Sequence, residues 1–170
     1  RLAYLDLVGT SGLSVFYLAM KRAVDVLESM PETDTARIAM TGLSGGGWQT
    51  ILLSALDTRI AVSVPNAGHI GIGHRASRVS DIGDLEQIPI DMLKVGDYEH
   101  LTAMLAPRPA LLIFNAKDEC CFAAAHAVPA VYEPTVPWYG LYGKEDHLSY
   151  HVNEDPGTHN YDQDNREAFY

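Results

Sequence analysis

The chain of 170 residues has few positive charges and no long hydrophobic segment. Its 12 lysines and arginines are outnumbered by 22 aspartates and glutamates, which gives a net charge of −10. Because nucleic-acid binding depends on clustered cations that neutralise phosphates, this balance predicts no nucleic-acid partner. No apolar run approaches the roughly 18 to 20 residues that cross a bilayer, so we expect a soluble protein without membrane contact.

Cysteine is also scarce, because Cys120 and Cys121 are the only two and they are neighbours. Adjacent Cα atoms lie closer together than the usual disulfide separation of about 4.4 to 6.8 Å, so we expect two free thiols. The segment 12–27, GLSVFYLAMKRAVDVL, has its cations after its apolar part, the opposite order to a signal peptide. The sequence therefore assigns no compartment.

The composition, 47% apolar and 20% charged, is typical of a soluble domain, and we expect one domain over residues 1–170. Helical and apolar runs alternate along the chain, which favours parallel strand pairing and an α/β fold, a mostly parallel sheet flanked by helices. Residues 68–107 are expected to form loops and short helices. The pattern predicts helices at 14–29, 48–56 and within 161–170, and strands at 37–42, 59–68 (stopped by Pro65), 108–118 and, more weakly, 136–143.

The segment 37–56, RIAMTGLSGGGWQTILLSAL, places Ser44 between glycines where the first strand gives way to a helix. A nucleophile elbow has this order, because a tight turn there exposes the serine hydroxyl beside a helix N-terminus. Gly42 and Gly46 are expected where a side chain would collide with a neighbouring strand or helix. The alternative is a glycine-rich turn in which Ser44 only caps the helix.

A serine nucleophile requires a base and an acid that orients the base. Where a nucleophile elbow is present, the acid and then the histidine follow in loops after later strands. Asp118 lies four residues beyond the apolar run 111–114, and His159 lies after the last strand and before the closing helix. Three other carboxylates in these loops are alternative candidates for the acid: Glu119, Asp146 and Asp155. If they are not the acid, we expect them to be solvated charges on loops.

Three segments carry a family resemblance: MTGLSGGGWQT at 40–50, HLTAMLAPRPALLIFNAKDECCF at 100–122 and DPGTHNYDQDNREAFY at 155–170. They resemble bacterial α/β-hydrolase esterases of the acetylxylan-esterase and dienelactone-hydrolase-like group, over nearly the whole chain. The resemblance implies that Ser44 is the nucleophile, His159 the base and Asp118 its partner. It also implies that no cofactor is needed and that the source is bacterial.

The resemblance is to the C-terminal half of that fold, because four strands are predicted where the complete fold has about eight. The missing half includes the loop that lends the second oxyanion donor, which leaves the backbone N–H of Gly45 as the donor in sight. A fragment, one half of a split protein and a reduced enzyme remain open. We expect the sheet edge beside strand 37–42 to be covered by a partner segment or by a second copy of the chain.

Two further side chains are candidates to contact a substrate. Trp48 lies one turn after Ser44, and His69 lies with His74 in a loop after the second strand. The alternatives are core packing for Trp48 and polar loop positions for the histidines. Four aromatic residues are expected to pack in the core around the last strand: Tyr132, Trp138, Tyr139 and Tyr142.

Histidines also gather near acidic residues towards the C-terminus, at His147, His151 and His159. They lack the HExxH spacing, and the turn residues of the segment 143–157 make one rigid ligand face doubtful. We therefore predict no metal at these residues.

Together these features predict a serine carboxylic ester hydrolase that acts on small acyl esters, with acetylated carbohydrate as one candidate substrate. A serine peptidase of the prolyl-oligopeptidase type shares the triad order and is one alternative. A catalytically inactive half-domain with a binding or assembly role is the other.

Overall fold

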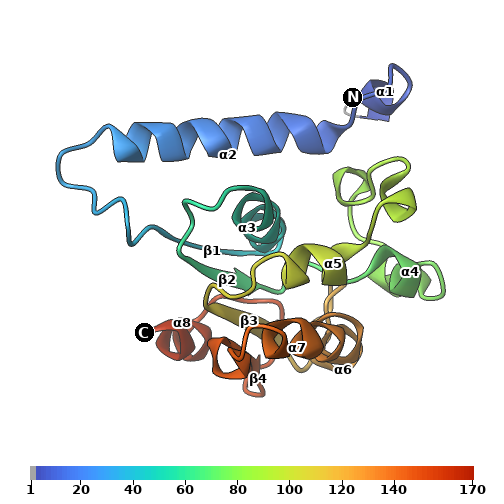
Figure 1. Cartoon of the computed structure of the whole chain (residues 1–170). Coiled ribbons are helices and arrows are strands. Elements are labelled where there is room, and N and C mark those ends of the chain that lie inside the picture. The colour runs from blue at the N-terminus through green and yellow to red at the C-terminus, as the bar shows by residue number, and fades with distance from the viewer. Residues whose placement is uncertain (1–2) are drawn as a thin grey trace.

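A computed structural model describes residues 3–170, which form one sheet of four parallel strands in the order β1-β2-β3-β4 (Figure 1). Each strand is therefore beside the next strand in the sequence. This arrangement confirms the predicted α/β fold with a parallel sheet. The strands are β1 (Ala39–Leu43), β2 (Val62–Asn66), β3 (Ala110–Asn115) and β4 (Leu148–Asn153).

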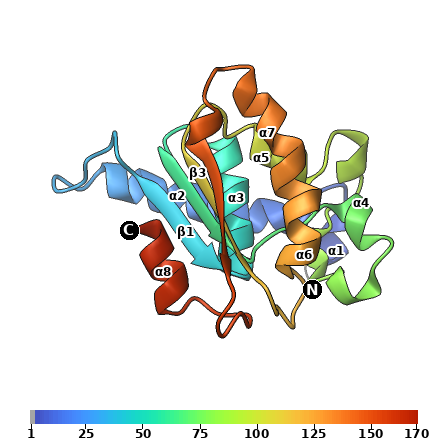
Figure 2. The same cartoon turned by 90° about the horizontal axis from the view of Figure 1, so that it is seen from below.

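The helices lie unequally on the two faces of the sheet. Figure 2 shows α3, α5, α6 and α7 on one side and α8 on the other, while α2 lies across α3 in Figure 1. No helix within residues 3–170 is long and apolar enough to cross a membrane. The helices are α1 (Ala3–Asp6), α2 (Gly12–Glu28), α3 (Gly45–Leu56), α4 (Ile72–Arg75), α5 (Tyr98–Ala103), α6 (Ala124–Ala127), α7 (Glu133–Gly140) and α8 (Gln163–Phe169), with short turns η1 (Val79–Asp81), η2 (Leu85–Gln87), η3 (Met92–Lys94), η4 (Val128–Tyr132) and η5 (Glu145–His147).

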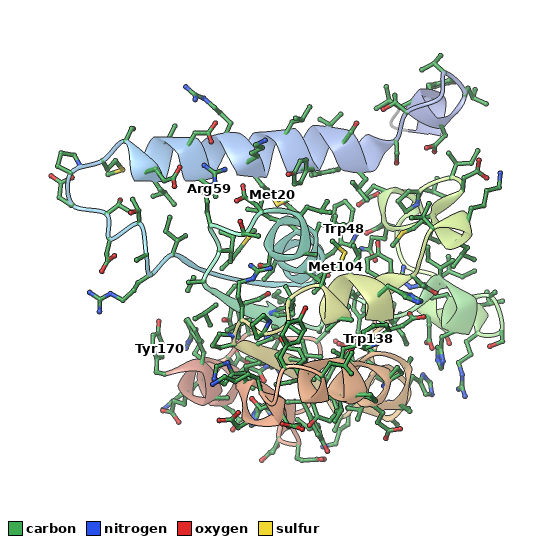
Figure 3. All side chains as sticks on the ribbon, viewed as in Figure 1. Met20, Trp48, Arg59, Met104, Trp138 and Tyr170 are labelled. Carbon is green, nitrogen blue, oxygen red and sulfur yellow. The ribbon has the colours of Figure 1, made fainter. Side chains whose placement is uncertain are left out.

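The long helix α2 is fixed to the core at two places. Met20 of α2 is buried between α2 and α3 (Figure 3), and Phe16 of α2 packs against the buried Trp48 of α3 with ring centroids 5.3 Å apart. Near the C-terminal end of α2, Arg59 donates to Asp25 at 2.9 Å and to Glu28 at 2.6 Å. The predicted helix at 14–29 is thus confirmed, with its apolar face turned towards α3.

Pro65 does not stop the second strand as predicted, because it lies inside β2. The amide of Ser63 donates to the carbonyl of Pro109, and the amide of Ala67 donates to that of Ile113. By this alternation, the residue between them would donate to β3, and a proline has no N–H to give. The sheet therefore loses one hydrogen bond at Pro65 and continues to Asn66.

The predicted strand at 136–143 is wrong, because its first half belongs to helix α7 and the fourth strand lies at 148–153. Val131, Thr135 and Tyr139 are fully buried at intervals of four residues, which is a helical period. Trp138 and Tyr142 are exposed, so the expected core role holds for Tyr139 but not for these two.

The turn before α3 depends on glycines that let backbone segments approach closely. A Cβ on Gly42 would lie 2.7 Å from the carbonyl carbon of Gly46, which confirms the crowding expected at Gly42. A Cβ on Gly46 would meet nothing within 4 Å, so the crowding expected there is wrong. The second crowded position is Gly47, where a Cβ would lie 2.5 Å from the carbonyl oxygen of Asn66 and 2.9 Å from the Cα of Gly68.

We expect Gly47→Ala to destabilise the protein by about 1–3 kcal/mol, because the methyl group would push α3 away from the end of β2. Gly46→Ala is the matched control in the same helix turn. It should leave stability unchanged or raise it by up to about 1 kcal/mol, because alanine restricts the unfolded chain. Urea unfolding followed by circular dichroism measures both, and equal stabilities for the two variants would contradict the packing argument.

Candidate active site

Ser44 occupies the turn between β1 and α3 in a strained backbone conformation. Its φ of 57° and ψ of −119° lie outside the regions that residues with a side chain normally adopt. The turn is held by the Ser44 amide, which donates to the carbonyl of Asn66 at 3.0 Å, and by the Ser44 carbonyl, which accepts from Trp48 at 2.8 Å. Strain of this kind at a strand-to-helix turn is typical of a nucleophile elbow.

The Ser44 side chain does not cap α3, since it accepts no hydrogen bond from the first turn of the helix. The alternative of a capping serine is therefore wrong. The residue is half-buried, and Gly45 opens the helix directly after it. Amides in a first helical turn have no intrahelical acceptor, so the N–H of Gly45 is free to bind an oxyanion beside Ser44.

Asp118 and His159, which are far apart in the sequence, form a hydrogen-bonded pair. Nδ1 of His159 lies 2.7 Å from Oδ2 of Asp118. The other oxygen of Asp118 accepts from the amides of Cys120 at 2.9 Å and Cys121 at 3.2 Å, and the side chain is fully buried. Both carboxylate oxygens thus have donors, and the imidazole is oriented by the acid as a catalytic base requires.

The pair shifts the pKa of both groups. Burial alone would raise the pKa of Asp118, but the hydrogen bonds from His159 and from loop amides outweigh it and hold the pKa below its usual value. The hydrogen bond to Asp118 raises the pKa of His159, against the effect of partial burial. Asp118 therefore stabilises the protonated imidazole, the form that appears when a base accepts a proton.

The competing carboxylates take other positions. Glu119 accepts the backbone amide of His159 at 3.0 Å and so holds the loop rather than the ring. Asp146 and Asp155 are exposed, and neither makes a hydrogen bond with the imidazole. The position of Asp118 just beyond the apolar run of β3 predicted the pairing correctly.

A network of asparagines, which the sequence analysis missed, connects the His159 loop to the sheet. Its hub is Asn160, directly after His159. Three strands end in an asparagine, and all three are fully buried: Asn66 in β2, Asn115 in β3 and Asn153 in β4. Together with Asn160 and Asn165 of α8, these are all the asparagines of the chain.

The hydrogen bonds of this network converge on Asn160. Its carbonyl accepts from Asn66 at 3.1 Å and from Asn165 at 2.9 Å. Its side-chain oxygen accepts from Asn153 at 3.4 Å and from the amide of Asp162 at 2.8 Å. Because the backbone carbonyl of Asn66 also accepts the amide of Ser44, one strand end is bonded to both the serine turn and the histidine loop.

The imidazole of His159 also packs on an aromatic ring. Phe122 stacks on His159 with ring centroids 6.3 Å apart and an interplanar angle of 28°. The buried guanidinium of Arg75 lies 5.4 Å from the centroid of Phe122 and donates to Gln87 at 3.1 Å. Arg75 and Gln87, which no motif singled out, thus lie behind Phe122, the ring that packs on His159.

Trp48 and His69, the two predicted substrate contacts, lie in the core and are each 1% exposed. The indole N–H of Trp48 donates to the hydroxyl of Tyr98 at 2.7 Å. Nε2 of His69 lies 3.1 Å from Oγ1 of Thr102, and burial lowers the pKa of His69 to about 3. Neither side chain offers a substrate a surface here. The packing alternative is confirmed for Trp48, whereas His69 is a buried histidine and not the polar loop residue that its alternative described.

The C-terminal histidines His147 and His151 bond to different partners. Nδ1 of His147 lies 2.8 Å from the carbonyl oxygen of Pro107, and Nε2 of His151 lies 2.7 Å from a carboxylate oxygen of Asp164. Within residues 3–170, the one group with ligand atoms close enough for a metal ion is elsewhere, at His74, Asp81 and His126.

We expect Asp118→Asn to lower the pKa of His159, because the amide cannot stabilise the imidazolium as a carboxylate does. An NMR titration of the imidazole proton resonances measures this, with the His159 signal assigned by its loss in His159→Gln. The signals of His147 and His151 in the same spectra report any general change in the fold. An unchanged midpoint for His159 would contradict the pairing.

The chain resembles known carbohydrate esterases. Residues 13–102 match the family model described as acetyl xylan esterase (AXE1), a span that contains Ser44 and ends before Asp118 and His159. A 4-O-methyl-glucuronoyl methylesterase from the fungus Wolfiporia cocos is 30% identical over 74% of this chain and 40% of its own length. The chain spans between 32% and 40% of the curated relatives that it matches.

Solved structures of esterases share the fold of this chain. Methylesterase BT1017 has a TM-score of 0.66 and 27% identity, with 92% of this chain and 33% of that protein covered. A glucuronoyl esterase from Solibacter usitatus, 19% identical, shares the fold with a TM-score of 0.73 over 95% of this chain and 48% of its own. The predicted resemblance to acetylxylan esterases is confirmed, and the chain belongs to the acetyl xylan esterase (AXE1) family.

Proposed function

We propose that this chain carries the catalytic triad of a serine carboxylic ester hydrolase, with Ser44 as nucleophile, His159 as base and Asp118 as the acid that orients it. The main support is geometric. Ser44 has a strained backbone at a strand-to-helix turn, and the end of β2 bonds that turn to the loop of a His159–Asp118 pair. Family membership supports the same chemistry.

The reaction would proceed through an acyl-enzyme. The imidazole of His159 takes the proton of the Ser44 hydroxyl as the hydroxyl oxygen attacks the ester carbonyl. The resulting imidazolium is stabilised by Asp118 and then protonates the leaving alcohol. Water, deprotonated by the same imidazole, attacks the acyl-enzyme and releases the acid. The N–H of Gly45 stabilises the oxyanion in both steps, and no step requires a cofactor.

The substrate class that we favour is a small acyl ester on a carbohydrate. The family description names acetyl xylan, in which the acyl group is small and the carbohydrate is the alcohol. The names of the relatives, glucuronoyl esterase and methylesterase, support a carbohydrate ester in general, because in a glucuronoyl ester the sugar acid is itself the acyl group. A prolyl-oligopeptidase-type peptidase would cleave amides with the same triad, so comparing matched ester and amide substrates separates the two. An inactive half-domain would hydrolyse neither.

Ser44→Ala should abolish labelling by a fluorophosphonate and reduce hydrolysis of a short-chain nitrophenyl ester by about 10⁴-fold or more. The reason is that Ser44 alone combines the strained turn with a helix N-terminus behind it. Ser29→Ala, at the end of α2, is the control and should keep both signals. Mass spectrometry locates the adduct, and labelling of another serine would refute the assignment.

Asn160→Ala should lower kcat by up to about 10²-fold with little change in KM, because the His159 loop loses the side-chain bonds to Asn153 and to the amide of Asp162 while the substrate surface is unchanged. The backbone carbonyl of residue 160 keeps its bonds from Asn66 and Asn165. Gln163→Ala, an exposed substitution on α8, is the control. Steady-state kinetics and the unfolding temperature are measured for both. A variant that is less stable but keeps its kcat would show that the network is structural only.

The outer edge of β1 and the helix beside it present apolar surface. Within residues 3–170, no strand pairs with that edge. Val15 and Leu18 of α2 are 50% and 62% exposed. A groove of about 160 Å³ between α2 and β1 is lined by Met20, Ala23, Val24, Leu27, Ile38, Ala39, Met40, Leu53 and Ile60. We propose that an additional strand-bearing segment, or a second copy of the chain, covers this edge and brings the second oxyanion donor.

If so, activity and assembly should rise together, and the added donor should raise the rate by about 10²- to 10³-fold. Size-exclusion chromatography with light scattering, run in parallel with the ester assay, tests this. A stable monomer of this chain with full turnover would show that the edge needs no partner.

A further inference from the structure

A cluster of two histidines and one aspartate lies outside the triad. His74 belongs to α4, Asp81 to η1 and His126 to α6. Oδ2 of Asp81 lies 3.0 Å from Nδ1 of His126 and 3.5 Å from Nε2 of His74. All three candidate ligand atoms are within 4.8 Å of one another. One carboxylate oxygen is thus faced by a nitrogen from each of two imidazoles.

The carboxylate of Asp81 has a hydrogen bond from His126 but, among the described residues, no permanent cation beside it. Its side chain is 6% exposed, and within residues 3–170 no lysine or arginine forms an ion pair with it. Its other oxygen accepts a hydrogen bond from the hydroxyl of Ser80. A buried carboxylate without a cation is costly, so this position favours a positive charge beside Oδ2.

His74 also has an unsatisfied polar atom at the same place. Its Nε2 is buried and has no hydrogen-bond partner, although it points towards Asp81. A buried ring nitrogen without a partner costs about 1–3 kcal/mol by itself. A cation between the three residues would satisfy the nitrogen and the carboxylate at once.

We propose that His74, Asp81 and His126 bind one divalent transition-metal ion of the zinc type. Tetrahedral zinc, with bonds of about 2.0–2.2 Å, holds neighbouring ligand atoms roughly 3.3 Å apart, close to the two distances from Asp81. Two imidazoles and one carboxylate are donors that zinc accepts. The histidine side chains are 22% and 30% exposed, so a water molecule can reach the fourth position.

Binding requires one local rearrangement. Arg78 donates to Nε2 of His126 at 2.9 Å, so in the metal-free chain the ring proton is on Nδ1, facing Asp81. To bind through Nδ1, His126 must move that proton to Nε2, and Arg78 must withdraw. Arg78 is exposed, so its side chain can turn into solvent without loss of packing.

The ion would join two segments of the chain that lie on either side, in sequence, of the loop that carries Asp118. Residues 74–81 lie after β2, and α6 begins shortly after Phe122, the ring that stacks on His159. The site is separate from the triad, so its existence does not depend on the esterase proposal. Its expected effect is to stabilise the fold, because an ion that binds only the folded chain raises the unfolding temperature.

Calorimetric titration of ZnCl₂ into the tag-free, chelator-treated chain should show one ion bound per chain. Thermal unfolding of the same sample, with and without ZnCl₂, should show that the ion raises the unfolding temperature. His126→Ala and Asp81→Asn should each weaken binding at least tenfold, since even indirect support of a metal ligand is worth about 10- to 100-fold. His151→Ala is the matched control, because His151 also pairs with an aspartate but has no second histidine there.

The adjacent thiols of Cys120 and Cys121 are the competing zinc ligands. Cys120→Ser should leave binding unchanged, and bound Co²⁺ should show tetrahedral visible bands without a thiolate charge-transfer band. Binding lost in Cys120→Ser, binding retained in His126→Ala, or no stoichiometric binding would each overturn the proposal. If Asp81→Asn fails to fold, His126→Ala still tests the proposal, because the His126 side chain is partly exposed.

Discussion

The candidate site depends on the close approach of α3 to the carboxyl end of β2. A Cβ at Gly47 would lie 2.5 Å from the carbonyl oxygen of Asn66 and 2.9 Å from the Cα of Gly68, so only glycine allows this approach. That contact brings the first turn of α3 against the strand end, where the amide of Ser44 reaches the carbonyl of Asn66. The positive φ of Ser44 is sustained because the strand before it and the helix after it are both fixed.

The same strand end also positions the loop that carries His159. Polar groups at the carboxyl edge of a parallel sheet leave the ladder and must find other partners. Here two of the terminal asparagines, Asn66 and Asn153, donate to Asn160 beside His159. Asn165 of α8 donates both to Asn160 and to the third terminal asparagine, Asn115. The network is incomplete, since Oδ1 of Asn66 and Nδ2 of Asn115 have no protein partner, which leaves sites where water can bind. The geometry of the proposed triad is thus held by hydrogen bonds between loops and strand ends rather than by apolar packing alone.

The two faces and edges of the sheet differ in how well they are covered. Three crossovers place helices on one face, whereas α8 alone lies on the other (Figure 2). The curated relatives are more than twice as long as the matched region, which fits a sheet with an unpaired edge at β1.

Local features of the sequence determined the elements whose signal is contained in a short segment. The strand, glycine turn and helix around Ser44 are contiguous, and the run 111–114 marks β3 and hence the position of Asp118. Local signals failed where tertiary contacts outweighed them. Pro65 remains in β2 because both neighbouring strands hold it, and α7 forms because Val131, Thr135 and Tyr139 share one buried face.

Only the tertiary structure decided which distant groups meet. Asp118 and His159 are 41 residues apart, and Asn66 and Asn160 are 94 apart. Chain order made the first pair predictable, because the acid and the base follow successive strands of a parallel sheet. The asparagine network and the cluster of His74, Asp81 and His126 had no such rule, since their residues come together only through the packing of loops whose spacing in the sequence carries no period.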